Sequence, residues 1–325
     1  MKTTHYFKQL ALVVTISCFA FSCNNDDDGY SAPEEPQSTT ITALASESND
    51  LSILVSALQA AGLDSTLDSE GSFTVFAPTN AAFENFLADN NFSGLSDIPV
   101  DVLTQVLLNH VIAGEVFSTS LTTSYGNTLA TKNGSGENLS IYIDTSNGVT
   151  LNGVSNVSVA DVDASNGVIH IVDAVIGLPT IATFATTNSA LSILVDALAY
   201  ADTGNPTVPY IDTVSNPTAG PFTVFAPTND AFVDLLGELE ISALTDLTPA
   251  QIDTVLLYHI VGANVQSSQL QTGVVSTLGG DITADATAFT LTDPNDRVSN
   301  IITALVDIQA ANGVVHVIDK VILNN

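Results

Sequence analysis

The chain has 325 residues, of which 45% are hydrophobic, so it is long enough to bury a core and to form more than one domain. Five basic residues stand against 35 acidic ones, which gives a formal net charge of −30 at pH 7. Binding to a phosphate backbone or an anionic membrane surface needs clustered lysines and arginines, so this composition excludes a nucleic-acid-binding protein and electrostatic docking on such a membrane.

Residues 1–22 have the pattern of a secretory signal peptide. Lys2 and Lys8 precede an apolar run, residues 10–21, which is too short to span a bilayer as a finished helix. Removal of this segment would leave only three basic side chains, those of Lys132, Arg297 and Lys320. The sequence therefore predicts an exported protein.

Cys23 follows the apolar run and is the predicted lipid attachment site. The other cysteine, Cys18, lies inside the run, so no internal disulfide is expected in the exported body. Residues 23–38 form an acidic tether, and the arrangement resembles surface lipoproteins of the Bacteroides–Flavobacterium group, although the residues before Ser22 depart from the usual signal. The alternatives are attachment at Cys18 and a plain secreted protein with one free thiol.

Most of the remaining chain consists of two copies of one sequence repeat. The stretch TVFAPTN occurs at residues 74–80 and again, letter for letter, at residues 223–229. His110 and His259 recur at matching places in the two copies. Matched motifs whose spacing varies by a few residues predict tandem domains rather than a short-period solenoid.

We expect the first domain to cover residues 39–178 and the second to cover residues 179–325. The short apolar junction after residue 176 predicts that the two domains touch. The second copy carries an insertion, Gly204–Gly220, which is rich in proline, asparagine and glycine and predicts a surface loop.

The repeated TVFAPTN stretch predicts a strand that leads into a helix. Pro78 ends a β-rich segment because it cannot donate a backbone hydrogen bond, and Thr79 or the next residue then caps the helix. Pro227 and Thr228 take these places in the second copy. We interpret all four residues as structural.

Four histidines lie on apolar faces at matched positions. His110 and His259 end apolar helical stripes, whereas His170 and His316 alternate with apolar residues in β-rich runs. The preferred interpretation is four core histidines whose ring nitrogens bond to backbone groups. The alternative is a two-histidine metal site in each domain, but spacing places no carboxylate or cysteine with them.

Asn166–Gly167 and Asn312–Gly313 each stand between two β-rich runs and predict hairpins of buried, central strands. Residues 161–165 have the spacing of a calcium loop, but Asn166 stands where such a loop requires glycine. The hairpin explains the segment better.

Common catalytic motifs are absent from the sequence, which contains no G-x-S-x-G, no H-E-x-x-H and no phosphate-binding loop. We therefore expect no enzyme, no cofactor and no metal. An enzyme whose pocket holds perturbed carboxylates stays open as an alternative, because a sequence does not display such a pocket.

The ordered motifs resemble those of fasciclin domains. FTVFAPTN-x-AF, LL-x-H-x-x-x-G-x-V and NGV-x-H-x-x-D-x-VI follow one another twice and cover nearly the whole chain after the tether. The resemblance implies an α+β fold with two tandem fasciclin-like domains, each a β-sandwich-like wedge flanked by helices. It also implies a non-enzymatic adhesion protein on the cell surface.

For this chain the resemblance suggests an outer-membrane lipoprotein that binds an extracellular protein, a polysaccharide or copies of itself, and that meets the membrane only through its lipid. The alternative is a glycan-binding accessory lipoprotein of a polysaccharide-uptake system. The absence of tryptophan counts against that alternative, because sugar sites commonly use exposed aromatic rings.

Three residues are candidates for interaction. In animal fasciclin proteins a tyrosine–histidine segment has been linked to integrin binding, and Tyr258–His259 match that pair, whereas the first copy has Asn109–His110. Tyr210 is the third candidate because it lies in the divergent insertion, and binding sites favour loops. A mere loop extension is the competing interpretation.

Overall fold

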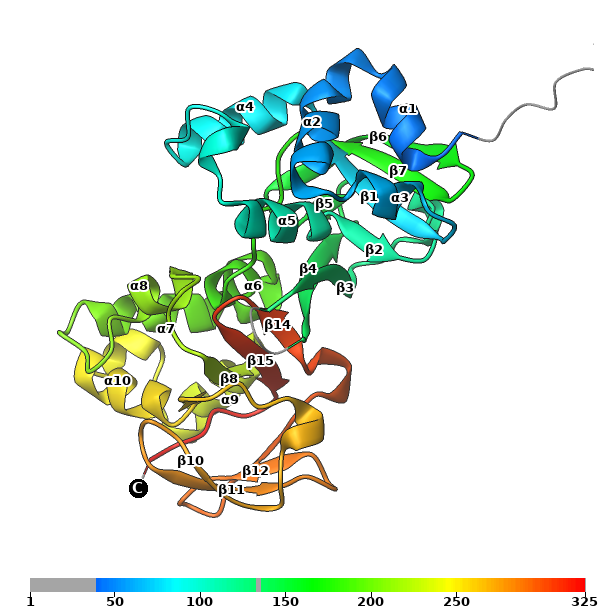
Figure 1. The fold of residues 1–325 in the computed structure, drawn as a ribbon. Helices are drawn as coiled ribbons and strands as arrows, with labels where there is room; N and C mark the ends of the chain where they lie inside the picture. The colour runs from blue at the N-terminus through cyan, green and yellow to red at the C-terminus, as the bar shows by residue number, and fades with distance from the viewer. Residues whose placement is uncertain (1–38, 133–135, 325) are drawn as a thin grey trace, which may run out of the picture. The chain divides into compact units, whose positions relative to one another are not determined.

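The computed structural model describes residues 39–132 and 136–324 (Figure 1). The predicted signal peptide, the tether and Cys23 lie outside the described residues. The described chain forms two domains of mixed helices and strands, as the sequence predicts. Among the described residues no single helix is long and apolar enough to cross a membrane; α6 and α7 pass that test only as a pair bent by 100°.

The first domain begins with helices and continues as strands interrupted by two further helices. Its elements are α1 (Ile41–Glu47), η1 (Asn49–Leu51), α2 (Ser52–Ala61), α3 (Asp64–Asp68), β1 (Phe73–Pro78), α4 (Asn80–Asp89), η2 (Leu95–Asp97), α5 (Val100–Leu108), β2 (Val111–Ala113), η3 (Ser118–Ser120), β3 (Ser124–Thr131), β4 (Asn138–Asp144), β5 (Thr150–Leu151), β6 (Ser155–Ala164) and β7 (Gly167–Val172).

The second domain repeats this order with one changed helix and more, shorter strands. Its elements are α6 (Ile181–Thr187), η4 (Ser189–Leu191), α7 (Ser192–Asp202), α8 (Tyr210–Ser215), β8 (Phe222–Pro227), α9 (Asn229–Glu238), η5 (Leu244–Asp246), α10 (Pro249–Leu257), β9 (Ile260–Val261), η6 (Ser267–Gln269), β10 (Gly273–Ser276), β11 (Asp281–Asp285), β12 (Thr290–Thr292), β13 (Val298–Asn300), η7 (Thr303–Leu305), β14 (Ile308–Ala310) and β15 (Gly313–Ile318).

The strands of the first domain close into a barrel in the order β1 to β7, whereas those of the second form two four-stranded sheets. The difference arises at one strand. In the first domain β6 runs without a break and pairs with both β5 and β7. Its counterpart is split by η7 into β13 and β14, which belong to different sheets. The expected sandwich-like wedge is therefore a closed barrel in the first domain.

The core of each domain lies between its helices and the parallel strand pair at the middle of its sheet. Strand β1 pairs in parallel with β7, and β8 pairs in parallel with β15. Phe83 on α4 and Phe232 on α9 are buried in the two helical cores, at matched positions of the helix after TVFAPTN. The apolar spacing of these helices thus fixes which face meets the sheet.

The strand-to-helix corner is present in both domains with the same geometry. Thr79 accepts a hydrogen bond on Oγ1 from the backbone N–H of Ala82, at 3.2 Å, and so caps α4. Thr228 does the same for Ala231, again at 3.2 Å. Proline is the last residue of each preceding strand.

The hairpins at Asn166 and Asn312 differ from the expectation in two details. Gly167 begins β7, so the two loop residues of the first hairpin are Ser165 and Asn166. Strands β7 and β15 are buried and central, but most of β6 is exposed. The prediction of two buried strands was wrong for β6, because its polar side chains alternate with valines and face solvent.

Candidate functional site

His110 and His259 each tie the end of a helix to the last segment of their domain. His110 Nδ1 donates to the backbone oxygen of Val106 at 2.7 Å, and His110 Nε2 accepts from the N–H of Ile176 at 2.8 Å. His259 makes the same pair of bonds, to Val255 at 2.9 Å and from Ile322 at 3.0 Å. Burial lowers the pKa of both imidazoles to about 4, so both rings are neutral at pH 7.

His170 and His316 occupy the other matched pair of positions, on the buried faces of β7 and β15. His170 Nε2 donates to the backbone oxygen of Val116 at 3.0 Å, and Nδ1 accepts from the N–H of Asp161 at 3.2 Å. His316 bonds in the same way to Val265 and Asp307. Each of the four histidines therefore uses both ring nitrogens on backbone groups, which leaves no nitrogen for a metal.

A serine, an aspartate and a histidine lie together near His170, and the sequence interpretation missed this cluster. Ser118 donates both its backbone N–H and its hydroxyl to the carboxylate of Asp161, which lowers the pKa of that carboxyl. Asp161 has φ of 61° and its counterpart Asp307 has φ of 56°. Ser267 repeats the serine contacts with Asp307. The signal available in the sequence was that an aspartate recurs at matched positions of the two copies, as Asp161 and Asp307.

This cluster has the wrong order for nucleophilic catalysis. An activated serine needs a histidine as its base, with the carboxylate behind the histidine. Here Ser118 bonds to Asp161, and the imidazole of His170 bonds to the backbone. The arrangement stabilises a left-handed backbone residue in a strand, which is a structural task. The described residues also contain no group of three or more histidine, cysteine or acidic side chains placed to hold a metal ion.

The remaining polar residues of TVFAPTN are equally committed to the scaffold. Thr74 donates its hydroxyl to the backbone oxygen of Gly114 and accepts from the N–H of Val116. Asn80 accepts from the N–H of Ile53 at 2.9 Å and donates to Asn49 and Ser52 near the start of α2. Thr223 and Asn229 repeat these bonds in the second domain.

The tyrosine–histidine pair offers little surface to a partner. His259 is 2% exposed, so its candidate role in interaction is corrected to a core role. Tyr258 is half-buried because its ring lies over Gly279 and Gly280, where an added Cβ atom would meet it at 2.5 and 2.6 Å. Asn109, the counterpart of Tyr258, is buried and donates to the backbone oxygen of Gly177.

Tyr210 is also a core residue, which corrects the expectation of an exposed loop. The insertion contains helix α8, and Tyr210 at its start is 0% exposed. The Tyr210 hydroxyl donates to the carboxylate of Asp253 at 2.8 Å, and burial followed by that carboxylate raises its pKa. Asp202 accepts from the backbone N–H groups of Tyr210 and Ile211 and so fixes the first turn of α8.

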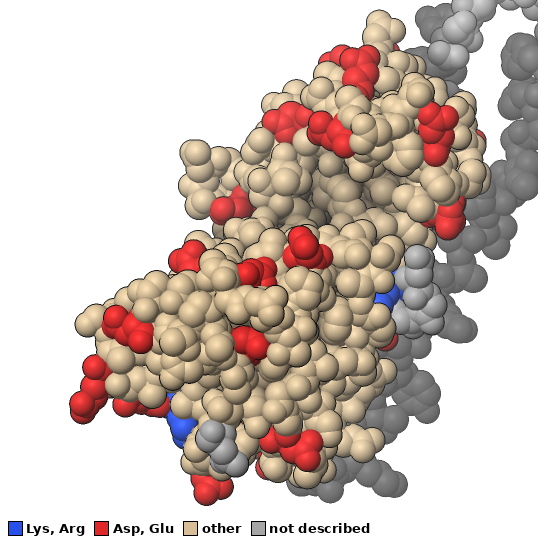
Figure 2. Space-filling view, turned by 90° about the vertical axis from the view of Figure 1, so that its left-hand side faces the viewer, with Lys and Arg blue, Asp and Glu red and all other residues tan. Residues whose placement is uncertain are grey.

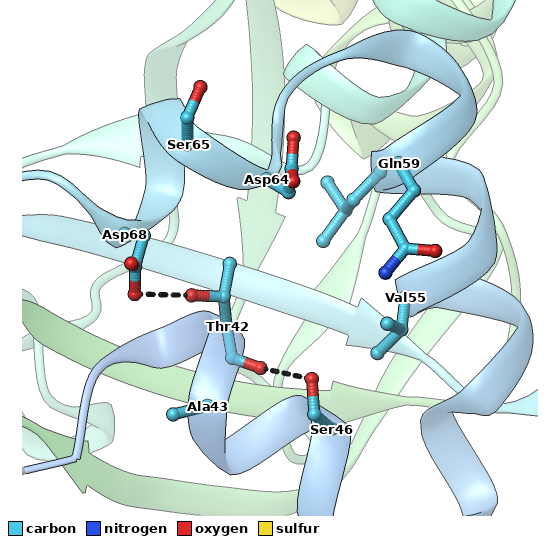
Figure 3. A pocket seen from close by; sticks show the side chains of 9 residues that line it. Thr42, Ala43, Ser46, Val55, Gln59, Asp64, Ser65 and Asp68 are labelled. Atoms are coloured by element: carbon cyan, nitrogen blue, oxygen red, sulfur yellow. Dashed lines mark hydrogen bonds between the residues drawn. The ribbon is translucent and has the colours of Figure 1, made fainter.

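A hollow lies between α1, α2 and α3 (Figure 3). Its volume is about 370 Å³. Hydroxyl, amide and carboxylate groups surround a small apolar floor, and the lining residues are Thr42, Ala43, Ser46, Val55, Leu58, Gln59, Asp64, Ser65 and Asp68. Such a mixture suits a small ligand with both polar and apolar faces.

Asp68 is a hydrogen-bonded carboxylate of this hollow. Its Oδ1 accepts hydrogen bonds from the hydroxyl groups of Thr40 and Thr42, the latter at 2.8 Å, and these bonds lower its pKa. Ser46 donates to the backbone oxygen of Thr42 at 2.7 Å (Figure 3). The carboxylate is therefore ionised at neutral pH and would repel an anionic ligand.

The second domain does not repeat the polar lining. Ala182 and Ala199 replace Thr42 and Gln59 at the matched positions of the first two helices. Helix α8 takes the place of α3. The amide of Asn166 donates to backbone oxygens at the end of α3, and the matched amide of Asn312 donates to backbone oxygens near the end of α8. The missed signal was thus a polar-to-apolar difference between the two copies.

Acidic side chains are spread over the face of the molecule shown in Figure 2, with few basic atoms among them. The three basic side chains among the described residues all bind within the protein. Arg297 contacts Asp293 and Glu238, Lys320 contacts Glu238, and Lys132 donates to Asn264. The surface therefore presents carboxylates to its surroundings.

Comparison with known proteins decides the family. The model of the fasciclin domain matches residues 49–179 and again residues 190–324. This chain belongs to the fasciclin family. Two fasciclin domains in tandem account for the duplicated motifs, and the matched histidines, threonines and asparagines belong to the scaffold of each fasciclin domain.

Relatives with fasciclin domains occur in bacteria. Protein sll1483 of Synechocystis sp. is 37% identical over 144 residues, covering 44% of this chain and 73% of that protein. The cell surface glycolipoprotein MPB83 of Mycobacterium bovis is 35% identical over 144 residues, covering 44% of this chain and 60% of that protein. A solved FAS1 domain pair from the insect cell adhesion molecule fasciclin I has 18% identity and a TM-score of 0.47, covering 83% of this chain and 94% of that one.

Proposed function

We propose that this protein is a non-enzymatic adhesion protein of the cell surface. Its two fasciclin domains would bind matrix protein, polysaccharide or neighbouring cells. The observation that supports this most is the use of the duplicated polar residues, since each matched histidine, threonine and asparagine is engaged in hydrogen bonds to backbone groups of its own domain. What is repeated is therefore a scaffold that displays surfaces, and two displayed copies gain by avidity.

The proposed location is the outer membrane, facing outward, with lipidated Cys23 as the anchor. The relation to a cell surface glycolipoprotein supports this proposal. A Cys23→Ala variant should no longer incorporate a fatty-acid label and should leave the membrane fraction, whereas Cys18→Ala should behave as the native protein. Retention of label by Cys23→Ala would contradict the proposed anchor.

Binding is tested with the compact unit Ser38–Asn325 on arrays of matrix proteins and glycans. We expect saturable binding to at least one extracellular protein or polysaccharide. Absence of any binding, together with chemical turnover of an array component, would refute a non-enzymatic adhesin.

A glycan-binding accessory protein of a polysaccharide-uptake system is the second candidate function. The hollow between α1, α2 and α3 favours it, because hydroxyl, amide and carboxylate groups around Val55 and Leu58 match the mixed surface of a sugar. Gln59→Ala combined with Asp64→Ala should abolish glycan binding in this case. The matched control is Ala199→Ser at the corresponding place in the second domain, which should leave binding unchanged.

A further inference from the structure

Strand β4 of the first domain is buried on both faces, whereas its counterpart β11 is buried on one. Leu139, Ile141 and Ile143 fill the barrel, yet the outward-facing Ser140 and Tyr142 are only 2% and 8% exposed. In β11 only the inward residues are buried, and the outward ones are exposed. Something other than the barrel must cover β4.

The second domain covers it. Ser140 Oγ accepts from the backbone N–H of Gln309 on β14 at 2.9 Å. The rings of Tyr125 and Phe184 are 5.6 Å apart, and Asn188 donates to the Tyr125 hydroxyl. We call the contributing residues of the first domain the docking face: Tyr125, Lys132, Ser140 and Tyr142. We call those of the second domain the acceptor edge: Phe184, Asn188, Asn264 and Gln309.

Because the domains are copies, each contains the counterpart of both surfaces. The hairpins align through the pairs Asn127 with Ser140 and Ser276 with Asp281. The counterpart of the docking face in the second domain consists of Val274, Asp281 and Thr283. The counterpart of the acceptor edge in the first domain consists of Leu44, Ser48, Glu115 and Asp163.

Most side chains of these two outer surfaces are exposed in the part of the chain that the structure describes. Val274 stands where Tyr125 stands in the first domain and is 70% exposed. Asp281 and Thr283 are exposed, as are Glu115 and Asp163. If two molecules repeated the internal contact, the outer surface on the second domain of one molecule would lie against the outer surface on the first domain of the other. Such a head-to-tail contact leaves a free surface at each end of the pair, so further molecules can add and form chains.

The outer surfaces differ from the inner ones in their aromatic side chains and in their charge, and the charge opposes association. Inside the molecule Gln309 exchanges hydrogen bonds with Asn264, and it also accepts from Gln266. Amides both donate and accept, so such a group can be buried with its polar atoms bonded. Asp163 and Glu115 stand at the positions of Gln309 and Asn264, and a carboxylate accepts hydrogen bonds but does not donate them.

The opposing surface makes the mismatch worse. Asp281 replaces Ser140, so a third carboxylate would face the other two across the contact. The shorter β10–β11 hairpin has no counterpart of Lys132, which donates to Asn264 inside the molecule. Like charges without a cation resist desolvation and repel each other.

We propose that the docking face is used once, within the chain, and that Glu115, Asp163 and Asp281 keep copies of the protein from joining head to tail. The proposal concerns contacts between copies and stands independently of the ligand that the domains bind.

The test compares variants of the Ser38–Asn325 unit by sedimentation velocity over a range of concentrations. A face-restored variant, Val274→Tyr with Thr283→Tyr, copies the two tyrosines of the docking face. A neutralised variant adds Glu115→Asn, Asp163→Gln and Asp281→Ser. We expect the native and face-restored proteins to stay monomeric and the neutralised variant to form concentration-dependent dimers and longer chains.

A charge-matched control adds Glu84→Gln, Asp89→Asn and Glu240→Gln to the two tyrosines, because these three carboxylates are exposed on other surfaces. It should stay monomeric. Association of the control to the same extent would overturn the proposal, since general loss of charge would then explain the effect. Association of the face-restored variant, or a neutralised variant that remains a monomer, would also overturn it.

Discussion

His110 and His259 stabilise the folded protein while they are neutral. The pKa of His110 and of His259 is about 4 in the folded protein, below the value of about 6.5 for an unfolded chain. Between these two pH values the unfolded state binds more protons than the folded state. The contribution of these histidines to the free energy of unfolding is therefore fully present above pH 6.5 and falls as the pH drops toward 4.

We expect each of these histidines to remove about 3 kcal/mol of stability by pH 4, measured by urea unfolding across that range. The double variant His110→Gln, His259→Gln should be less stable at pH 7 but should lose less on acidification. An equal pH dependence in the native protein and this variant would contradict the neutral-core account.

His259→Ala should destabilise the second domain at neutral pH. The substitution removes the hydrogen bonds that the imidazole makes to the N–H of Ile322 and to the oxygen of Val255. It also opens a cavity. Together these effects cost roughly 2 to 4 kcal/mol. Calorimetry that gives an unchanged melting temperature would refute this assignment.

At the scale of elements, helix α8 of the second domain stands in the place of α3 of the first. Tyr210→Phe should cost about 1 to 2 kcal/mol, because Asp253 loses the bond from the buried hydroxyl. The control Ile211→Ala changes a side chain that is 38% exposed on the same helix and should have little effect. Thermal unfolding of both variants would distinguish them, and equal stability would show that the Tyr210–Asp253 hydrogen bond does not stabilise the domain.

Deletion of residues 204–220 would for the same reason unfold the second domain rather than only remove a loop. Tyr210 fills the core of that domain, and Asn312 donates to backbone oxygens near the end of α8. Proline, asparagine and glycine on both sides of a short helical segment concealed this role in the sequence.

The sequence predicts the repeated elements well because their signals are local. Pro78 and Thr79 mark the end of a strand and the start of a helix, and the spacing of apolar residues marks the buried face. It does not predict the barrel closure or the hollow at Asp68. Both depend on segments far apart in the chain, since Asp68 is held by Thr40 and Thr42, and closure requires β6 to remain unbroken.

The sequence also did not predict which candidate interaction residues are buried, again because burial depends on tertiary packing. Tyr210 and His259 have residue types that suit either a surface or a core, and only tertiary packing decides between them. The four histidines were easier to interpret, because each lies on an apolar face of its element.

At the scale of the whole molecule, the contact between the domains couples their stabilities. Tyr142 of the first domain belongs to the hydrophobic core of the second, and its ring lies 4.8 Å from that of Tyr125. Tyr142→Ala should cost about 3 kcal/mol or more and should separate one cooperative unfolding transition into two. The matched control is Thr283→Ala at the exposed counterpart, which should leave a single transition. A single transition in Tyr142→Ala would contradict the coupling.

The central claim is that duplication here multiplies a displayed scaffold and not a reactive site. The most direct test is quantitative binding of the Ser38–Asn325 unit to purified matrix proteins and polysaccharides, with mass spectrometry of the ligand before and after incubation. The account predicts saturable binding of a ligand that is recovered chemically unchanged. Conversion of the ligand into a new product would contradict it.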